Sequence, residues 1–144
     1  MLKGDVLKND SCPIVNLHTS YLPFNRGTHP NFWSFYDGTP SGVTIHLINE
    51  GVEKGIDTGD VLFQRHVKFD AEEKTFRQTY KRLMDEIEAL FIENMAVIMS
   101  KNFSVTPQMG AGSCHKEVDL PKEFEGWDSV IADEIARLHG LLNG

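Results

Sequence analysis

Asn16 and His18 stand two residues apart at the end of the apolar run PIVNLH, directly before a loop that contains proline and glycine. Residues i and i+2 of a β-strand point to the same face, so both side chains should lie together at the carboxyl end of a strand, where open α/β sheets keep their sites. A carboxamide and an imidazole that converge on one point can hydrogen-bond a developing oxyanion, and the imidazole can also move a proton. The alternative is a structural role, which is the more frequent one for an arbitrary histidine beside a strand end.

Asp57, within GIDTGD, is the carboxylate that could complete such a site. A flexible loop presents it just before a strand. If it lies near His18, it should raise the pKa of the imidazole and orient the ring, as the third member of an acid–base group does. The same letters are a common turn composition, so a turn without a chemical role is the alternative.

Two further groups of residues could support the site. Thr44 and His46 share one face of the next expected strand, and Thr44 could hold the carboxylate or a water molecule there; an exposed polar strand face is the alternative. Asn25, Arg26 and Gly27 form a loop whose arginine could clamp an anion through two hydrogen bonds; a solvated arginine is equally consistent with the pattern.

The elements that must position these residues follow from hydrophobic periodicity and turn residues. In chain order we expect a buried strand over 13–18, a loop over 19–30, one or two helical turns over 31–38, half-buried strands over 41–49 and 60–69, a long helix over 71–101, an irregular segment over 102–127 and an amphipathic helix from 127 onward. The two later strands should form an antiparallel pair. Asn31 is the expected N-cap of the first helix, and Asp128 or Ser129 that of the last.

The length, composition and net charge of the chain restrict the class of protein to which it can belong. The 144 residues fit one domain spanning 1–144, and 40% hydrophobic residues suffice for a core. A net charge of −7 argues against a general affinity for nucleic acid. No apolar run has the length of a membrane span, and the first residues lack the apolar core of a signal peptide. Cys12 and Cys114 form no CxxC pair, the six histidines show no metal-ligand spacing, and reduced thiols in a cytoplasmic protein are expected.

Taken in order, the motifs NLHTSYLPFNRG, GVTIH and GIDTGDVL resemble the signature of the 10-formyltetrahydrofolate-dependent formyltransferase family over 13–64. The family signature has proline and serine after the histidine, whereas this chain has Thr19 and Ser20. The segment before Asp57 is longer, as if VEKG were inserted, so Glu53 could be aligned with the acid instead. Asp57 is preferred because Thr58, Gly59 and Asp60 follow it as in the signature.

The resemblance implies a reaction and roles for the residues. The acceptor amine would attack the formyl carbon on N10 of the donor, 10-formyltetrahydrofolate. His18, as imidazolium, and Asn16 would stabilise the oxyanion, while Asp57 would keep His18 charged and relay a proton. Thr44 and His46 would support this trio. The folate would border the loop of Gly55, Ile56 and Asp57, and Asn25, Arg26 and Gly27 would contact substrate.

The resemblance also implies the acceptor and the fold. RGTHPNFWS and the tail QMGAGSCHKEVDL are similar to members that formylate a nucleotide-linked amino sugar; the acidic composition disfavours a transfer RNA acceptor. Hydrolysis of the formyl donor, or a silent half-domain that acts as a binding module, are the alternatives. The implied fold is the C-terminal half of a Rossmann-like α/β domain with a mixed sheet, a long helix and a C-terminal helix. The family's N-terminal half has no counterpart here, so a homo-oligomer is expected to cover the exposed sheet edge.

Overall fold

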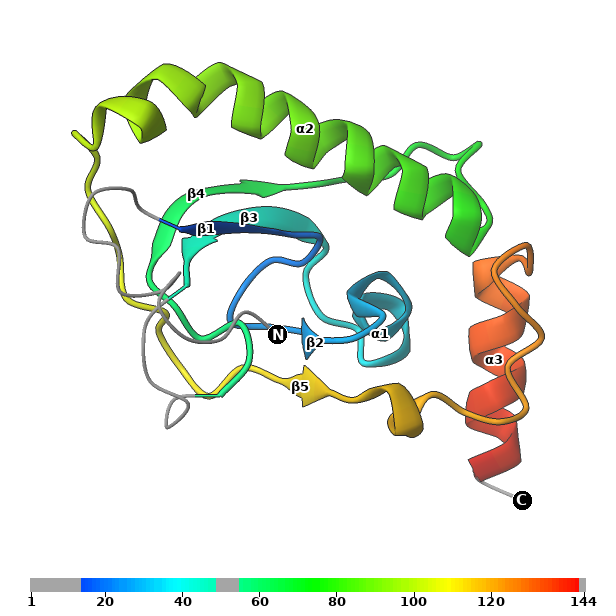
Figure 1. The fold of residues 1–144 in the computed structure, drawn as a ribbon. Coiled ribbons are helices and arrows are strands. Elements are labelled where there is room, and N and C mark those ends of the chain that lie inside the picture. Colours follow the sequence, from blue (N-terminus) through cyan, green and yellow to red (C-terminus); the bar gives the residue numbers. More distant parts are fainter. Residues whose placement is uncertain (1–13, 49–54, 143–144) are drawn as a thin grey trace.

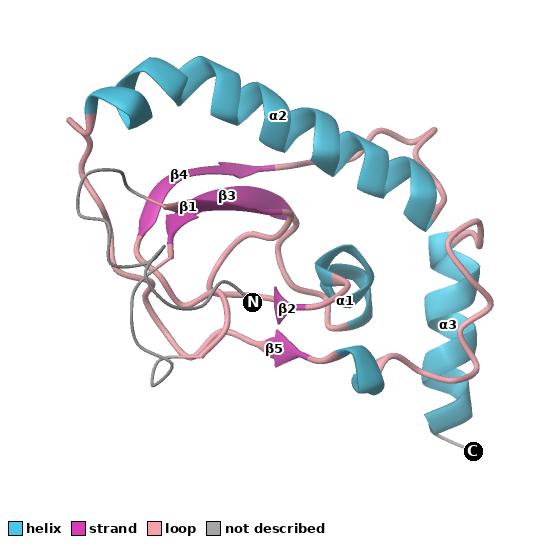
Figure 2. Cartoon of the chain, viewed as in Figure 1, coloured by secondary structure: helices cyan, strands magenta, loops and turns pink. Residues whose placement is uncertain are grey.

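The computed structural model describes residues 14–48 and 55–142 as a small mixed α/β structure (Figures 1 and 2). Its elements, in chain order, are β1 (Val15–His18), β2 (Arg26–Gly27), α1 (Pro30–Tyr36), β3 (Gly42–Leu47), β4 (Val61–His66), α2 (Phe76–Ser100), β5 (Cys114–His115), a 3-10 turn (Glu117–Asp119) and α3 (Ile131–Leu142). The expected fold class is confirmed, including the antiparallel pair β3–β4, the long helix and the C-terminal helix.

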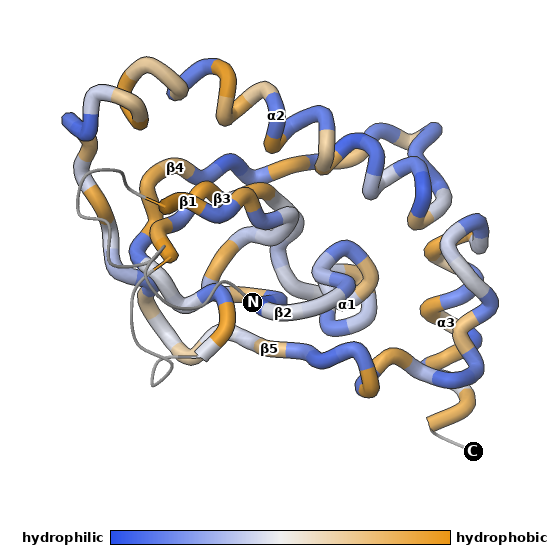
Figure 3. Tube along the Cα trace, viewed as in Figure 1, coloured by the Kyte–Doolittle hydropathy of each residue, from blue (hydrophilic) through white to orange (hydrophobic). Residues whose placement is uncertain are grey.

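The main sheet has the order β1-β3-β4, and all its pairs are antiparallel. Val43 and Ile45 of β3 point toward α2 and pack with Leu83, Ile87 and other apolar residues of the helix into the first core cluster. Apolar and polar residues alternate along α2 in Figure 3, as expected for a helix that covers one face of a sheet. The polar residues of β1 and β3 are therefore directed to the opposite face, where β2, β5 and α1 lie (Figure 1).

A second cluster joins α1 to α3. Phe32 and Trp33 of α1 pack with Phe76 at the start of α2 and Leu138 of α3. Asn31 is buried inside α1, and its side chain donates to the Phe76 carbonyl at 2.9 Å. It is thus not the N-cap that the sequence suggested: the helix begins at Pro30 after His29, because proline fits the first helical position.

Both long helices begin later than expected. Thr75 caps α2 through a capping box with Gln78, so the helix starts at Phe76 and residues 71–75 lie outside it. Asp128 does not cap α3, because its carboxylate pairs with Arg77 instead, and the helix starts at Ile131. The segment expected to be irregular contains the short strand β5, which pairs in parallel with β2.

Two residues named from the sequence fall outside the described ranges. Cys12 and Glu53 lie outside the described residues, whereas Cys114 is an exposed free thiol. Across the described part of the chain, no helix combines the length and the apolar character needed to cross a bilayer.

The packing of α2 on β3 predicts a large effect of a core substitution. Leu83 is 1% exposed at the centre of the first cluster. Leu83→Ala should lower the free energy of unfolding by about 2–5 kcal/mol, because it removes buried methyl groups and leaves a cavity. Urea unfolding measures this. Ile92→Ala, on the same helix at a side chain that is 69% exposed, is the matched control and should change little; equal losses for both variants would contradict this packing.

Candidate active site

Antiparallel pairing of β1 and β3 brings four polar side chains onto one face of the sheet. Asn16 lies opposite His46 in the ladder, and His18 lies opposite Thr44. Residues two apart on each strand share a face, so the register places all four on the same side. His18, Thr44 and His46 are buried.

Asp57 reaches this face from the turn before β4. It adopts a left-handed backbone conformation with φ of 53°, which is uncommon for a residue other than glycine. Its Oδ1 accepts a hydrogen bond from Asn16 Nδ2 at 3.0 Å, and its Oδ2 accepts from the Gly27 backbone N–H at 2.9 Å. His18 Nε2 lies 3.7 Å from Oδ2, and His46 Nε2 lies 3.5 Å from Oδ1. Asn16, His18 and Asp57 therefore converge, with His46 as a fourth member.

The carboxyl of Asp57 stays ionised in this setting. Burial alone would raise its pKa. The nearby imidazoles of His46 and His18 and the hydrogen bond from the Gly27 N–H act in the opposite direction, and the net pKa lies below the ordinary value. The site therefore holds a negative charge at neutral pH.

The pKa of His18 differs from what the resemblance implied. Burial lowers its pKa, and the charge of Asp57 and the hydrogen bond to the Asn25 carbonyl raise it without offsetting the burial, so the net pKa lies below 6.5. This direction favours a neutral His18 in the resting site at pH 7, in place of the imidazolium that the resemblance implied. Its Nε2 donates to the Asn25 carbonyl at 3.1 Å, which leaves Nδ1 as the ring nitrogen with a lone pair.

Asn16 uses both hydrogens of its amide inside the site. Nδ2 donates to Asp57 Oδ1 and also lies 3.2 Å from His46 Nε2. The reverse orientation of the amide would place its oxygen against the carboxylate, so the charge of Asp57 determines the orientation. His46 Nδ1 donates to the Leu47 carbonyl at 3.0 Å, and Nε2 is thereby the acceptor.

The other predicted residues lie nearby with contacts that sequence did not anticipate. Thr44 Oγ1 donates to the Ser20 carbonyl at 2.7 Å and so holds the loop after β1 rather than Asp57. Asn25 is fully buried, and it contacts His18 through its backbone carbonyl. Gly27 has φ of +88°, and a Cβ there would lie 2.1 Å from the His115 carbonyl oxygen, so only glycine fits.

The guanidinium group of Arg26 is hydrogen-bonded within the protein. Its Nε and Nη2 donate to Gln108 Oε1 at 3.0 and 2.7 Å. Gln108 in turn contacts the turn that carries Asp57. Gln108 carries no sequence signal of its own, although it is the first residue of the tail segment QMGAGSCHKEVDL, which resembles the sugar-amine members.

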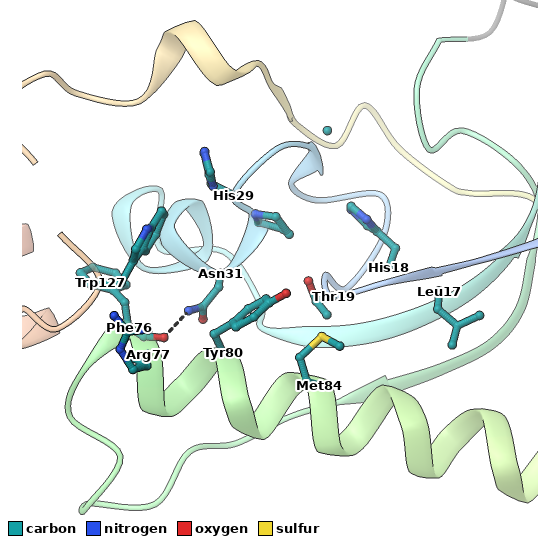
Figure 4. Close-up of a pocket in the computed structure, with 12 residues that line it drawn as sticks. Leu17, His18, Thr19, His29, Asn31, Phe76, Arg77, Tyr80, Met84 and Trp127 are labelled. Atoms are coloured by element: carbon teal, nitrogen blue, oxygen red, sulfur yellow. Dashed lines mark hydrogen bonds between the residues drawn. The ribbon is translucent and has the colours of Figure 1, made fainter. Parts of the chain in front are cut away.

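A pocket of about 640 Å³ adjoins His18 (Figure 4). Its walls come from the end of β1, the start of α1, the first half of α2 and Trp127. They include Leu17, Thr19, Tyr80 and Met84, and Figure 4 shows His18 at one end of this space. The volume and mixed lining suit a small organic molecule. Tyr80 and Met84 fall within the long helix predicted over 71–101, and their helical spacing gives no sign that they line a pocket.

The described residues therefore combine a neutral imidazole, an ionised carboxylate and a carboxamide beside a pocket. Such a group can remove a proton from a nucleophile and stabilise charge that develops on a carbonyl group. Among residues 14–48 and 55–142, no set of three or more His, Cys, Asp or Glu side chains is arranged to hold a metal ion.

Comparison with known proteins identifies similar chains. A family model described as formyl transferase matches residues 1–95. The solved formyltransferase PseJ from Anoxybacillus kamchatkensis, in complex with UDP-4,6-dideoxy-4-formamido-L-AltNAc and tetrahydrofolate, is 38% identical; the match covers 95% of this chain and 72% of that one, with a TM-score of 0.82.

Two curated relatives extend the comparison. The dTDP-4-amino-4,6-dideoxyglucose formyltransferase of Mycobacterium tuberculosis is 30% identical over 134 residues, which are 93% of this chain and 53% of the relative. The methionyl-tRNA formyltransferase of Lachnospira eligens is 31% identical over 145 residues, 99% of this chain and 44% of the relative. The chain thus spans about half the length of these curated relatives.

Proposed function

The chain belongs to the formyl transferase family, and from this membership we propose that it transfers a formyl group from 10-formyltetrahydrofolate to the primary amine of a nucleotide-linked amino sugar. The observation that carries the proposal is the convergence of Asn16, His18 and Asp57 beside a pocket of about 640 Å³. The complex of PseJ with a UDP-linked formamido sugar and tetrahydrofolate supports both the donor and the class of acceptor.

The donor fits the side of the site formed by Gly55, Ile56 and Asp57. Ile56 is 59% exposed directly before the site carboxylate, and it offers an apolar surface to a flat ring system. The donor supplies the activated one-carbon group. The residues of this chain supply its position against His18 and the ionised Asp57.

The acceptor fits the pocket that His18 lines. Tyr80 and Trp127 provide aromatic surface for a base or sugar ring. An amine bound here would approach the formyl carbon from the side of the imidazole. His18 therefore lies between the two substrates.

The proton transfers follow from the neutral state of His18. The amine lone pair forms the new C–N bond to the formyl carbon, and Nδ1 of His18 accepts the proton that the amine loses. When the bond between the formyl carbon and N10 breaks, the imidazolium returns this proton to N10. Asp57, which carries a negative charge 3.7 Å from Nε2, stabilises the imidazolium while it exists.

Asn16 must exchange one contact to assist this step. Both of its amide hydrogens are directed to Asp57 and His46 in the resting site. The bond to the carboxylate is charge-assisted and, at 3.0 Å against 3.2 Å, shorter, so the contact with His46 is the one to be released. The freed N–H can then donate to the formyl oxygen as negative charge develops there.

Purified protein incubated with 10-formyltetrahydrofolate and UDP- or dTDP-linked 4-amino sugars tests the proposal. Mass spectrometry should show that the sugar gains one formyl group, and the N-acetylated sugar, which lacks the amine, is the matched control. Release of formate at the same rate with and without the amine would show hydrolysis instead. No turnover of the donor with any amine would contradict the proposed activity.

Two expectations about assembly remain proposals. We propose that the chain folds as one domain, because α2 contributes Leu83 to the first core cluster and Phe76 to the second, and Phe35 beside the second cluster contacts Phe69 beside the first. A homo-oligomer stays a prediction: within the described residues β1 pairs with β3 alone, and Leu17 on this strand is 39% exposed.

A further inference from the structure

Gln108 is the half-buried residue in an otherwise exposed stretch from Ser104 to Ala111. It follows Thr106, which is bridged to Val61 at the start of β4 by two backbone hydrogen bonds of 2.8 and 2.9 Å. This bridge brings the segment beside the turn that carries Asp57. The side chain of Gln108 then turns inward.

All four hydrogen-bonding positions of this carboxamide are used. Nε2 donates to the carbonyls of Asp57 and Gly59, each at 2.8 Å, and Oε1 accepts two N–H groups of Arg26. Because arginine can only donate and the carbonyls can only accept, the opposite orientation of the amide would break all four contacts. The orientation of Gln108 is thereby determined.

The contacts of Gln108 hold the part of the site whose backbone conformation is least favourable. Asp57 is in the left-handed region of backbone space, where a residue with a Cβ costs free energy, and surrounding contacts must hold it there. Its side chain is held by Asn16 and Gly27, and its main chain is held by Gln108. Gly59 anchors the other end of the turn, since a Cβ there would lie 1.7 Å from the Leu47 carbonyl oxygen.

The hydrogen bonds of Gln108, Asp57 and the two residues of β2 form a closed ring. Gly27 holds the carboxylate of Asp57, its neighbour Arg26 holds Gln108, and Gln108 holds the backbone of Asp57. We propose that Gln108 is a positioning residue, which holds the Asp57 turn so that the carboxylate faces His18. The effect on catalysis rests on the proposed function; the effect on the geometry of the site does not.

Two substitutions separate this role from simple pairing with Arg26. Gln108→Glu keeps an acceptor for the guanidinium but removes both donors to the turn carbonyls. Gln108→Met removes donors and acceptor at similar volume. Met109→Gln, at a neighbouring side chain that is 77% exposed, is the matched control. Thermal unfolding confirms that each variant is folded.

The first readout is the NMR titration of His18 in the protein without substrates. Because the charge of Asp57 raises the pKa of His18, a displaced carboxylate should shift the titration to lower pH in both Gln108 variants and not in the control. An unchanged titration in Gln108→Met, which introduces no charge of its own, would overturn the proposal. This result does not depend on whether the protein is a formyltransferase.

The second readout is the rate of formyl transfer. Both Gln108 variants should lower kcat by about tenfold to a hundredfold, as misplacement of a reacting group does, while KM for the acceptor amine stays near the wild-type value. A rise in KM with unchanged kcat would overturn the positioning role. If the wild-type protein has no transferase activity, the proposed function fails, and the titration alone decides the role of Gln108.

Discussion

His18→Gln should lower the rate of formyl transfer by about a hundredfold to ten-thousandfold, the range that a positioned acid–base group contributes. Glutamine can still donate to the Asn25 carbonyl, as Nε2 of His18 does at 3.1 Å, so the loop after β1 keeps its anchor. It has no group that can accept a proton from the acceptor amine at neutral pH. Steady-state kinetics with the amino sugar measure the loss.

The pH dependence provides a second criterion for the role of His18. Burial lowers its pKa, so the acidic limb of kcat/KM should lie below the ordinary histidine value of 6.5 and be absent in His18→Gln. His66→Gln, at an exposed histidine of β4, is the control and should keep both rate and limb. A His18→Gln variant within about tenfold of wild type would assign the proton transfer to another group, since even a modest general base contributes more.

The same shift predicts a change in stability. A histidine whose pKa is lower in the folded protein binds fewer protons than it does in the unfolded chain, so the free energy of unfolding should fall as pH decreases through 6.5. His18→Gln removes this contribution, and its unfolding curve should depend less on pH in that range. Urea unfolding at several pH values measures both slopes.

The sequence was sufficient to predict which polar side chains share a face on β1 and on β3. It was insufficient to predict which groups these side chains contact. The period of two in a strand placed Asn16 with His18 and Thr44 with His46, and antiparallel pairing then brought the pairs together. The local sequence pattern does not predict the hydrogen-bond partner of a buried hydroxyl group. Thr44 is an example, because its hydroxyl donates to the Ser20 carbonyl. The charge state of His18 was missed for a related reason: burial dominates its pKa, and burial is a property of the assembled fold.

The tail shows where periodicity carries no information. β5 has two residues, too few for any alternation, and it pairs in parallel with β2 from far along the chain. Gln108 looks like an ordinary polar loop residue until the Thr106 bridge places it on the turn of Asp57. The start of α2 is the opposite case, because the capping box of Thr75 and Gln78 could be read directly from TFRQ.

Asp57→Asn should lower the rate of formyl transfer by about a hundredfold or more and also shift the acidic limb of kcat/KM to lower pH. The carboxylate accepts from Asn16 Nδ2 with one oxygen and from the Gly27 N–H with the other. An asparagine side chain has one oxygen and one NH₂ group, so in either orientation one of these donors meets another donor. The geometry of the site is therefore disturbed as well as its charge.

The direction of the limb shift follows from that charge. Asp57 raises the pKa of His18 against the larger effect of burial, so removal of the negative charge lowers this pKa further and neutral His18 persists to lower pH. Asp60→Asn, three residues further along the chain, is the matched control for loss of a carboxylate and should leave the limb in place. A limb that moves to higher pH in Asp57→Asn, or does not move, would show that Asp57 does not stabilise the protonated form of His18, and the proposed stabilisation of the imidazolium would then be wrong.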